Sequence, residues 1–285
     1  MALSSLAQRV TTVALLVPAV LAGLFLLPPS AWALATLAIM ALAAHEWSKL
    51  AGLTLHRAVA LIGGVVLLGC FLLFSPALGF ARGWPDAVVL AICGTATAFW
   101  MLAAPAWLAR PSKARAWLLT TLVAWVVLVG AWVAVVELQA RSPWLVLAAM
   151  AVVWIADTAA YFTGRKFGRR KLAPSISPNK SWEGVWGGLG AVALYAVALT
   201  QFSGEAGYGG TRSVGFGLAF VLFVMILAAV SVIGDLYESM LKRQAGVKDS
   251  GSLLPGHGGV LDRIDALLAA MPLAALAAAV FLPKT

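Results

Sequence analysis

The chain has 285 residues, of which 62% are hydrophobic and 11% are charged. Soluble globular domains carry about 25% charged residues, so this sequence lacks the polar surface of a water-soluble globule, and its hydrophobicity excludes a disordered chain. We therefore expect a membrane protein. In that setting the net charge of +9 does not indicate a nucleic-acid partner, and we expect none. Cys70 and Cys93 lie in apolar runs, which argues against a disulfide framework or a zinc site.

Apolar stretches of the length that crosses a bilayer predict an all-α polytopic membrane protein with about nine transmembrane helices. The expected spans are 10–27, 31–44, 58–79, 87–108, 116–136, 143–163, 184–203, 214–234 and 266–283. The second span is short and runs into His45 and Glu46, so its limits stay open. The first resembles a signal peptide, but its apolar stretch exceeds the roughly 7–15 residues typical of one, and we expect a retained helix.

The basic residues of the connecting loops predict the orientation of these spans. Sixteen of the twenty Lys and Arg residues fall on one side, which we assign to the cytoplasm together with the N-terminus. The other side carries Arg82, Arg141, Arg212 and Lys284. Two cytoplasmic loops, 164–183 and 235–265, are long, polar and rich in Gly and Pro. We therefore divide the chain into N-terminal transmembrane helices, 1–137, and a catalytic transmembrane region, 138–285.

Asp157 follows the apolar run that ends at Ala156, at or just inside a helix end. A carboxylate in hydrocarbon costs a few kcal/mol, so it needs a partner or a wet cavity. A structural ion pair with Arg165 or Lys166 would satisfy it, but we favour a role in a functional site.

The first long loop contains a basic run, Arg165 to Lys171, followed by Ser177-Pro178-Asn179-Lys180-Ser181. The basic run is typical of a topology signal or a contact with anionic lipid. The second stretch predicts a turn before a helix that begins near Trp182, and Lys180 at a helix N-terminus suits a phosphate. Ser181 could equally be an ordinary N-cap.

The second long loop begins with Asp235, Glu238, Ser239 and Lys242, which share one face if the preceding span continues as a helix. A helical ion pair would explain Glu238 and Lys242 but not Asp235, which directly follows an apolar run. A glycine-rich turn around His257 could bring backbone N–H groups close to an anion.

Asp262 and Asp265 follow that turn, one helical turn apart. Carboxylates that face a phosphate-binding loop require a cation between them, and oxygen ligands favour Mg²⁺ over zinc. We expect a metal-dependent polyphosphate site at the cytoplasmic membrane surface, suited to transfer between a soluble nucleotide and a lipid. The alternatives are a secondary transporter of an anionic solute and another lipid-phosphate nucleotidyltransferase or kinase.

The segment Ser239 to Asp265 reads SMLKRQAGVKDSGSLLPGHGGVLDRID. It resembles the C-terminal motif of the phosphatidate cytidylyltransferases (CDP-diacylglycerol synthases), and every fixed position of that motif is met. Residues Asp157 to Gly184 also resemble this family, with Thr158 where many members have Ser. The first ~140 residues resemble it only in being apolar spans.

The resemblance implies that CTP and phosphatidate give CDP-diacylglycerol and pyrophosphate, in phospholipid biosynthesis at the cytoplasmic (inner) membrane. It also implies a divalent cation, with a second cation left open, and a homodimer. Asp235 and Asp262 would hold the metal, with Asp157 in support. The other expected catalytic residues are Lys242, Arg243, Lys248 and His257. The expected substrate-binding residues are Ser177, Asn179, Lys180, Ser181, Asp249, Gly258, Gly259, Arg263 and Asp265.

Overall fold

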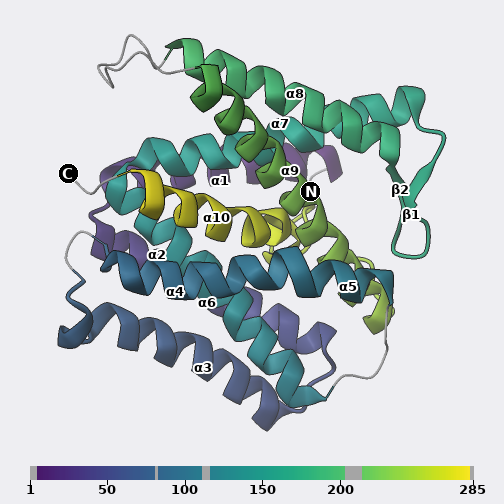
Figure 1. Cartoon of the computed structure of the whole chain (residues 1–285). Helices are drawn as coiled ribbons and strands as arrows, with labels where there is room; N and C mark the ends of the chain where they lie inside the picture. The colour runs from purple at the N-terminus through teal and green to yellow at the C-terminus, as the bar shows by residue number, and fades with distance from the viewer. Residues whose placement is uncertain (1–4, 81–82, 111–115, 203–213, 283–285) are drawn as a thin grey trace.

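The computed structural model describes residues 5–80, 83–110, 116–202 and 214–282. These residues form a bundle of helices with one small β-hairpin (Figure 1). The helical elements are α1 (Ser5–Leu26), α2 (Pro29–Leu50), α3 (Leu55–Phe74), η1 (Pro76–Leu78), α4 (Asp86–Ala98), η2 (Phe99–Ala103), α5 (Ala104–Ala109), α6 (Trp117–Arg141), α7 (Pro143–Phe167), α8 (Trp182–Phe202), α9 (Val214–Ala245) and α10 (Leu261–Phe281). The strands are β1 (Lys171–Ala173) and β2 (Ser177–Ser181).

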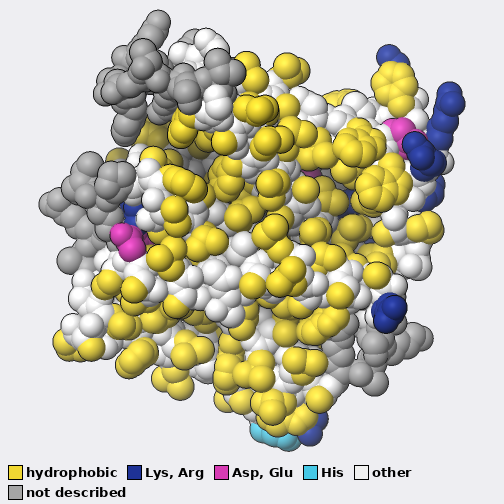
Figure 2. Space-filling view, viewed as in Figure 1, with side chains coloured by type: hydrophobic (Ala, Val, Ile, Leu, Met, Phe, Trp, Pro, Cys, Tyr) yellow, Lys and Arg dark blue, Asp and Glu magenta, His cyan; other side chains and the backbone are white. Residues whose placement is uncertain are grey.

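Seven helices of the described residues are long and apolar enough to cross a membrane: α3, the continuous α4–η2–α5 segment, and α6 to α10. The visible face of the molecule is correspondingly covered by hydrophobic side chains (Figure 2). The predicted all-α polytopic membrane protein is therefore confirmed. α1 and α2 also coincide with predicted spans, but the total of nine crossings and the cytoplasmic N-terminus stay predictions. Five basic residues used for the orientation lie outside the described residues: Arg82, Lys113, Arg115, Arg212 and Lys284.

Several helices extend further than the apolar pattern predicted. α2 continues to Leu50, beyond the expected end at residue 44, and α9 continues to Ala245. The predicted loop 235–265 is therefore helical at its start, and only 246–260 connects α9 to α10. Polar residues can continue a helix beyond the apolar stretch because backbone hydrogen bonding does not depend on side-chain hydrophobicity.

The predicted loop 164–183 is also more ordered than expected. α7 runs to Phe167, and β1 and β2 then form an antiparallel hairpin in which Lys171 pairs with Ser181 and Ala173 with Ser177. The expected turn over residues 177–181 is wrong, because this stretch is the second strand of the hairpin. The strand leads directly into α8, so its last residues have a fixed position.

Glycines on α8 allow this helix to lie very close to α7. A Cβ atom on Gly184 would lie 2.9 Å from the carbonyl oxygen of Ala160, and one on Gly188 would lie 2.9 Å from that of Ala156. This four-residue spacing of small residues is typical of close helix pairs in membranes. The contact fixes the hairpin between α7 and α8 relative to the bundle.

α10 lies in the middle of the bundle, against α4, α6 and α9 (Figure 1). Its contact with α9 is close because Gly234 has no side chain. A Cβ atom there would lie 2.5 Å from the carbonyl oxygen of Asp265 and 2.9 Å from Cβ of Ala269. The polar residues that follow Gly234 on α9 therefore lie beside the first turns of α10.

Candidate active site

The polar face of α9 forms as the helical spacing predicted. The Ser239 hydroxyl donates to Oδ1 of Asp235 at 3.3 Å, and Lys242 forms an ion pair with Glu238 one turn away. The opposite side of the helix is anchored by Tyr237, which is buried among aromatic rings. These rings belong to Trp47, Phe99, Trp100 and Trp107. This packing fixes the rotation of α9, so the direction of its polar face is set by the core.

Lys180 of β2 reaches the first carboxylate of this face. Its Nζ atom lies 2.5 Å from Oδ2 of Asp235, although the two residues are 55 positions apart in the sequence. Asp157 of α7 lies close enough to both side chains for their charges to interact. Arg165 instead donates to Tyr161 at 3.3 Å, and Lys166 lies over the ring of Phe167, so the alternative of an ion pair between these basic residues and Asp157 finds no support.

Lys242 joins α9 to α10. Its Nζ atom lies 2.6 Å from Oδ1 of Asp262 while it also pairs with Glu238. Asp265 lies within range of the charges of Asp235, Lys180 and Lys242. The structure thus brings together acidic and basic residues from the hairpin, α9 and α10.

The loop before α10 wraps around the second oxygen of Asp262. Oδ2 accepts hydrogen bonds from the N–H of Ser250 at 2.9 Å, from its hydroxyl at 3.0 Å, and from the N–H of Gly259 at 2.8 Å. Gly258 makes this turn possible because its φ is +82° and a Cβ atom would lie 2.7 Å from the same oxygen. The carboxylate of Asp262 is therefore held on one oxygen by the loop and on the other by Lys242.

Glu46 of α2 is a residue of this region that the sequence analysis missed. It is only 4% exposed and accepts the Ser250 hydroxyl at 2.9 Å and the N–H groups of Val260 at 3.0 Å and Leu261 at 2.8 Å. It thereby satisfies N–H groups at the start of α10 that have no partner within the helix. An acidic residue at the end of an apolar span was the signal that could have identified it.

The remaining predicted residues occupy the edge of this region. Arg243 donates through Nε to the carbonyl of Ile176 at 3.3 Å, and Arg263 donates to that of His257 at 3.0 Å. The ring of His257 lies 3.4 Å from the carbonyl oxygen of Pro255. Ser177 is half-buried, while three others are exposed: Asn179, Lys248 and Asp249. These residues are accessible to a ligand, but the structure does not bring them into the network of ion pairs.

Two predicted phosphate contacts also have hydrogen-bond partners within the protein. Ser181 is 5% exposed, and its Oγ accepts the N–H of Gly184 at 3.2 Å, which makes it the N-cap of α8. The N–H of Gly259 donates to Asp262, and that of His257 to the carbonyl of Leu254. These groups have partners within the protein, and the expectation that Ser181 and Gly259 contact a phosphate stays a prediction.

The carboxylates of this region suit Mg²⁺ in one specific way. No three acidic, histidine or cysteine side chains of the described ranges gather closely enough to form a ligand set by themselves. Mg²⁺ usually takes only one or two carboxylates and completes its shell with water and substrate phosphates. Asp235 and Asp262 supply two such carboxylates, each of which a cation would share with the lysine that pairs with it. The donor set therefore fits a cation held jointly by the protein and a bound polyphosphate.

Comparison with known proteins identifies the family of this chain. The model of the cytidylyltransferase family matches residues 7–281. The chain belongs to this family. It is 39% identical over 284 residues to phosphatidate cytidylyltransferase from Haemophilus influenzae, covering 94% of this chain and 96% of that protein. The protein of the same name from Pseudomonas aeruginosa is 41% identical over 280 residues, covering 94% of each.

The resemblance inferred from the Ser239–Asp265 motif is thus confirmed for nearly the whole chain. The cytidylyltransferase match includes the N-terminal helices, for which the sequence alone offered only hydrophobicity. The chain is also 45% identical over 119 residues to phosphatidate cytidylyltransferase from Thermotoga maritima. This shorter match covers 42% of this chain and 43% of that protein. Membership in this family identifies an enzyme and does not favour the transporter alternative.

Proposed function

We propose that this enzyme transfers the cytidylyl group of CTP to phosphatidate, giving CDP-diacylglycerol and pyrophosphate. The observation that carries the proposal is the convergence of two Lys–Asp pairs, Lys180–Asp235 and Lys242–Asp262, from three separate elements. The reaction requires two highly charged phosphate groups to approach each other, and alternating positive and negative side chains suit that task. The names of the relatives support the same choice of substrates.

In the proposed reaction, an oxygen of the phosphatidate phosphate attacks the α-phosphorus of CTP in line. The bond between the α-phosphorus and the bridging oxygen breaks, and pyrophosphate leaves with that electron pair. The nucleophile is already anionic near neutral pH, so no side chain has to remove a proton from it. The protein acts by positioning the reactants and by offsetting charge.

The position of each basic residue suggests which phosphate group it would contact. Lys180 and Lys242 lie beside the carboxylates and would each hold a phosphate oxygen at the reacting centre. Arg243 and Lys248, at and after the end of α9, would hold the triphosphate and the leaving group. His257, on the turn before α10, would be a further donor. Other proposed substrate contacts are Ser177, Asn179, Ser181, Asp249, Gly258, Gly259, Arg263 and Asp265.

Asp235 and Asp262 would hold Mg²⁺, with Asp157 supporting the site through its charge. When bound there, the cation would supply neutralisation of the phosphate charge during transfer. Ser239 orients Asp235, and the loop of Ser250 and Gly259 orients Asp262. Groups that hydrogen-bond to a metal ligand fix its orientation, and metal affinity and activity depend on that orientation.

The test is turnover by the purified chain in detergent micelles, with radiolabelled CTP, phosphatidate and Mg²⁺. We expect labelled lipid product and pyrophosphate, and loss of both when Mg²⁺ is chelated. A panel of other lipid phosphates, polyprenols and nucleotides separates this reaction from that of a related nucleotidyltransferase or kinase. Transport into vesicles without any turnover in micelles would contradict the proposal.

The proposal also places the enzyme in the cytoplasmic membrane as a homodimer, with its site facing the cytoplasm. The basic residues around the hairpin and the loop 246–260 favour that orientation. Light scattering of the purified protein in detergent measures the oligomeric state. A fluorescent reporter fused to the N-terminus, which folds only in the cytoplasm, tests the orientation.

A further inference from the structure

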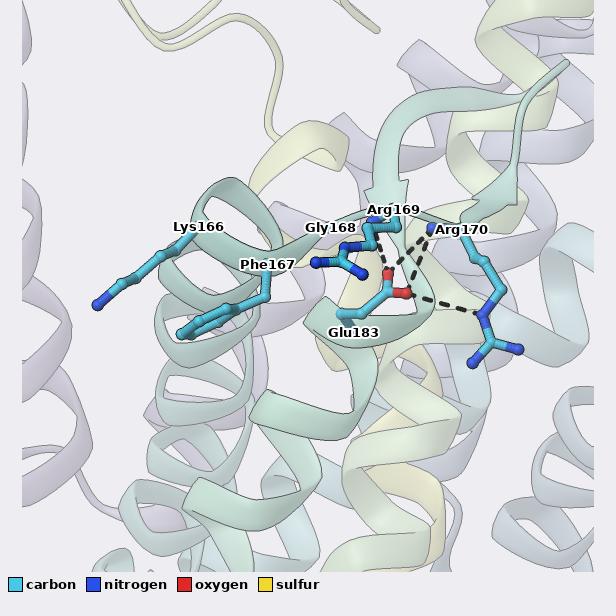
Figure 3. A pocket seen from close by; sticks show the side chains of 6 residues that line it. All are labelled: Lys166, Phe167, Gly168, Arg169, Arg170 and Glu183. Atoms are coloured by element: carbon cyan, nitrogen blue, oxygen red, sulfur yellow. Dashed lines mark hydrogen bonds and ion pairs between the residues drawn. The ribbon is translucent and has the colours of Figure 1, made fainter.

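A second charged region lies where α7 ends and α8 begins, on the hairpin side of the bundle. A pocket of about 760 Å³ is present there. Its lining residues are Lys166, Phe167, Gly168, Arg169, Arg170 and Glu183 (Figure 3). In the space-filling view, Lys and Arg side chains gather at this end of the molecule, beyond the hydrophobic face (Figure 2). None of these residues has a role in the proposed reaction.

The single carboxylate of the pocket is occupied by the protein itself. Glu183 accepts the N–H of Arg169 at 3.0 Å and that of Arg170 at 3.2 Å, and it forms an ion pair with Nε of Arg170 at 3.7 Å. The guanidinium of Arg169 and the ammonium of Lys166 pair with no carboxylate in the described part of the chain. The pocket therefore presents more positive charge than its own acidic residue can neutralise.

The backbone holds these basic residues in a fixed arrangement. The N–H of Trp182 donates to the carbonyl of Arg170 at 2.9 Å, and β1 and β2 continue from that point. The turn after α7 is tight, since a Cβ atom on Gly168 would lie 2.2 Å from the carbonyl oxygen of Gly164. Binding an anion here would require little ordering of the backbone, and low ordering cost favours affinity.

The surroundings of the pocket are those of a membrane–water boundary. α7 and α8 are both long apolar helices, and the pocket lies at their adjacent ends. A second hollow of about 420 Å³ adjoins it through Arg170 and is lined also by Lys171, Trp182 and Trp186. Both indoles are accessible, with Trp186 62% exposed. Tryptophan is enriched at the level of lipid head groups, and basic pockets between membrane helices bind anionic ones.

We propose that this pocket binds the phosphate of an anionic bilayer phospholipid that is not the reacting substrate. Arg169 and Arg170 would hold the phosphodiester, and the acyl chains would lie along Trp182 and Trp186. The proposal depends on the placement of α7 and α8 in a membrane and not on the reaction catalysed, so it can fail or succeed independently of the proposed function.

The experiment is native mass spectrometry of the full-length, delipidated protein in detergent, titrated with phosphatidylglycerol. We expect the double variant Arg169→Gln/Arg170→Gln to bind this lipid about 10-fold more weakly than the unmodified chain, because each basic residue near the surface contributes to binding. The matched control is Arg57→Gln, which removes a guanidinium that lies over Trp117, outside the pocket. The control should bind as the unmodified chain does.

The other arms identify the ligand. Phosphatidylcholine, which has no net charge, should bind weakly and equally to all variants, and millimolar inorganic phosphate should not displace phosphatidylglycerol. If the double variant does not fold, Arg169→Gln alone keeps the ion pair between Arg170 and Glu183 and serves in its place. Equal binding by the pocket variant and the control, displacement by inorganic phosphate, or a pocket that retains phosphatidate but no other anionic lipid would each overturn the proposal.

Discussion

The two ends of α10 are satisfied by the same physical device. At its start, the carboxylate of Glu46 accepts the N–H groups of Val260 and Leu261. At its end, the guanidinium of Arg141 donates to the carbonyl oxygens of Ala278, at 3.1 Å, and Leu282. In each case a charged side chain from another helix binds backbone groups at one end of α10, and its charge is opposite to the adjacent end of the helix dipole.

The difference lies in what else each charged residue holds. Glu46 also accepts the hydroxyl of Ser250, which in turn bonds to Asp262. Arg141 pairs with Asp86 and Glu137, and Glu137 accepts the N–H of Trp84 at 3.0 Å. The first network reaches the candidate active site, and the second joins the ends of α4, α6 and α10. A buried charge at a helix end therefore does not indicate a functional role by itself. The other residues that it binds decide whether it is linked to the active site.

Substitution of the two aspartates of the candidate active site should have the largest effect on turnover. We expect Asp262→Asn and Asp235→Asn each to lower turnover by about 10³-fold or more, because the loss of a metal ligand removes several kcal/mol of charge stabilisation. The control is Asp86→Asn, which removes the carboxylate that pairs with Arg141 near the other end of α10. This variant should keep the turnover of the unmodified enzyme. Turnover of CTP with phosphatidate is measured on equal amounts of membrane protein. Near-normal activity of either site variant would remove that residue from the metal site.

Glu46→Gln should have the next largest effect. The amide would present N–H groups to backbone N–H donors, so the loop that holds Asp262 would shift, and groups that orient metal ligands typically contribute about 10–100-fold to activity. We expect kcat to fall in that range while KM for CTP changes little. The control is Glu137→Gln, a fully buried glutamate of the other network, which should lower the melting temperature without changing kcat of the folded enzyme. Equal effects of the two variants on kcat would show that Glu46 contributes only stability.

Basic residues near the two regions should differ less sharply. Lys248 lies on the loop that leads to the start of α10, and we expect Lys248→Ala to raise KM for CTP about 10-fold, since a charge-assisted contact with phosphate is worth roughly 1.5–3 kcal/mol. Arg169→Ala should change turnover in detergent less than twofold, because Arg169 lies in the lipid pocket. Initial rates over a range of CTP concentrations compare the two. Similar losses would show that this division of the basic residues is wrong.

Arg141→Gln should have the smallest effect on the reaction. It leaves Glu137 buried without its charged partner, which typically costs about 3–5 kcal/mol of stability. We therefore expect a clear drop in the melting temperature and a kcat within twofold of the unmodified enzyme. Thermal unfolding followed by fluorescence, together with turnover well below the melting temperature, separates the two quantities. A fall in kcat comparable to that of Glu46→Gln would mean that both ends of α10 are coupled to the site.

The features that could be predicted from the sequence are those with local causes. The helices follow from apolar stretches of bilayer length, and the face that carries Asp235, Ser239 and Lys242 follows from helical spacing alone. The motif from Ser239 to Asp265 identified the family because many fixed residues occur together in one short segment. None of these inferences required knowledge of how the helices pack.

The features that could not be predicted depend on contacts between distant segments. Lys180 and Asp235 are 55 residues apart, and Glu46 and Ser250 are 204 apart; no local pattern states that such residues meet. Ser181 had two plausible roles, and only the geometry of the first turn of α8 identified it as a cap. The hairpin was missed because its strands are too short to show an alternating pattern.

The hydrogen bonds of Glu46 determine whether the C-terminal half of this enzyme can be separated from the N-terminal helices. A fragment that begins at residue 138 would keep every residue assigned to the reaction, yet the amides at the start of α10 would lose their acceptor. Unpaired amides are costly in an apolar environment. The N-terminal helices are therefore more than an anchor: the second half of the chain is not a transplantable unit, and a chimaera with a foreign N-terminal half would need an equivalent acid at the end of its second helix.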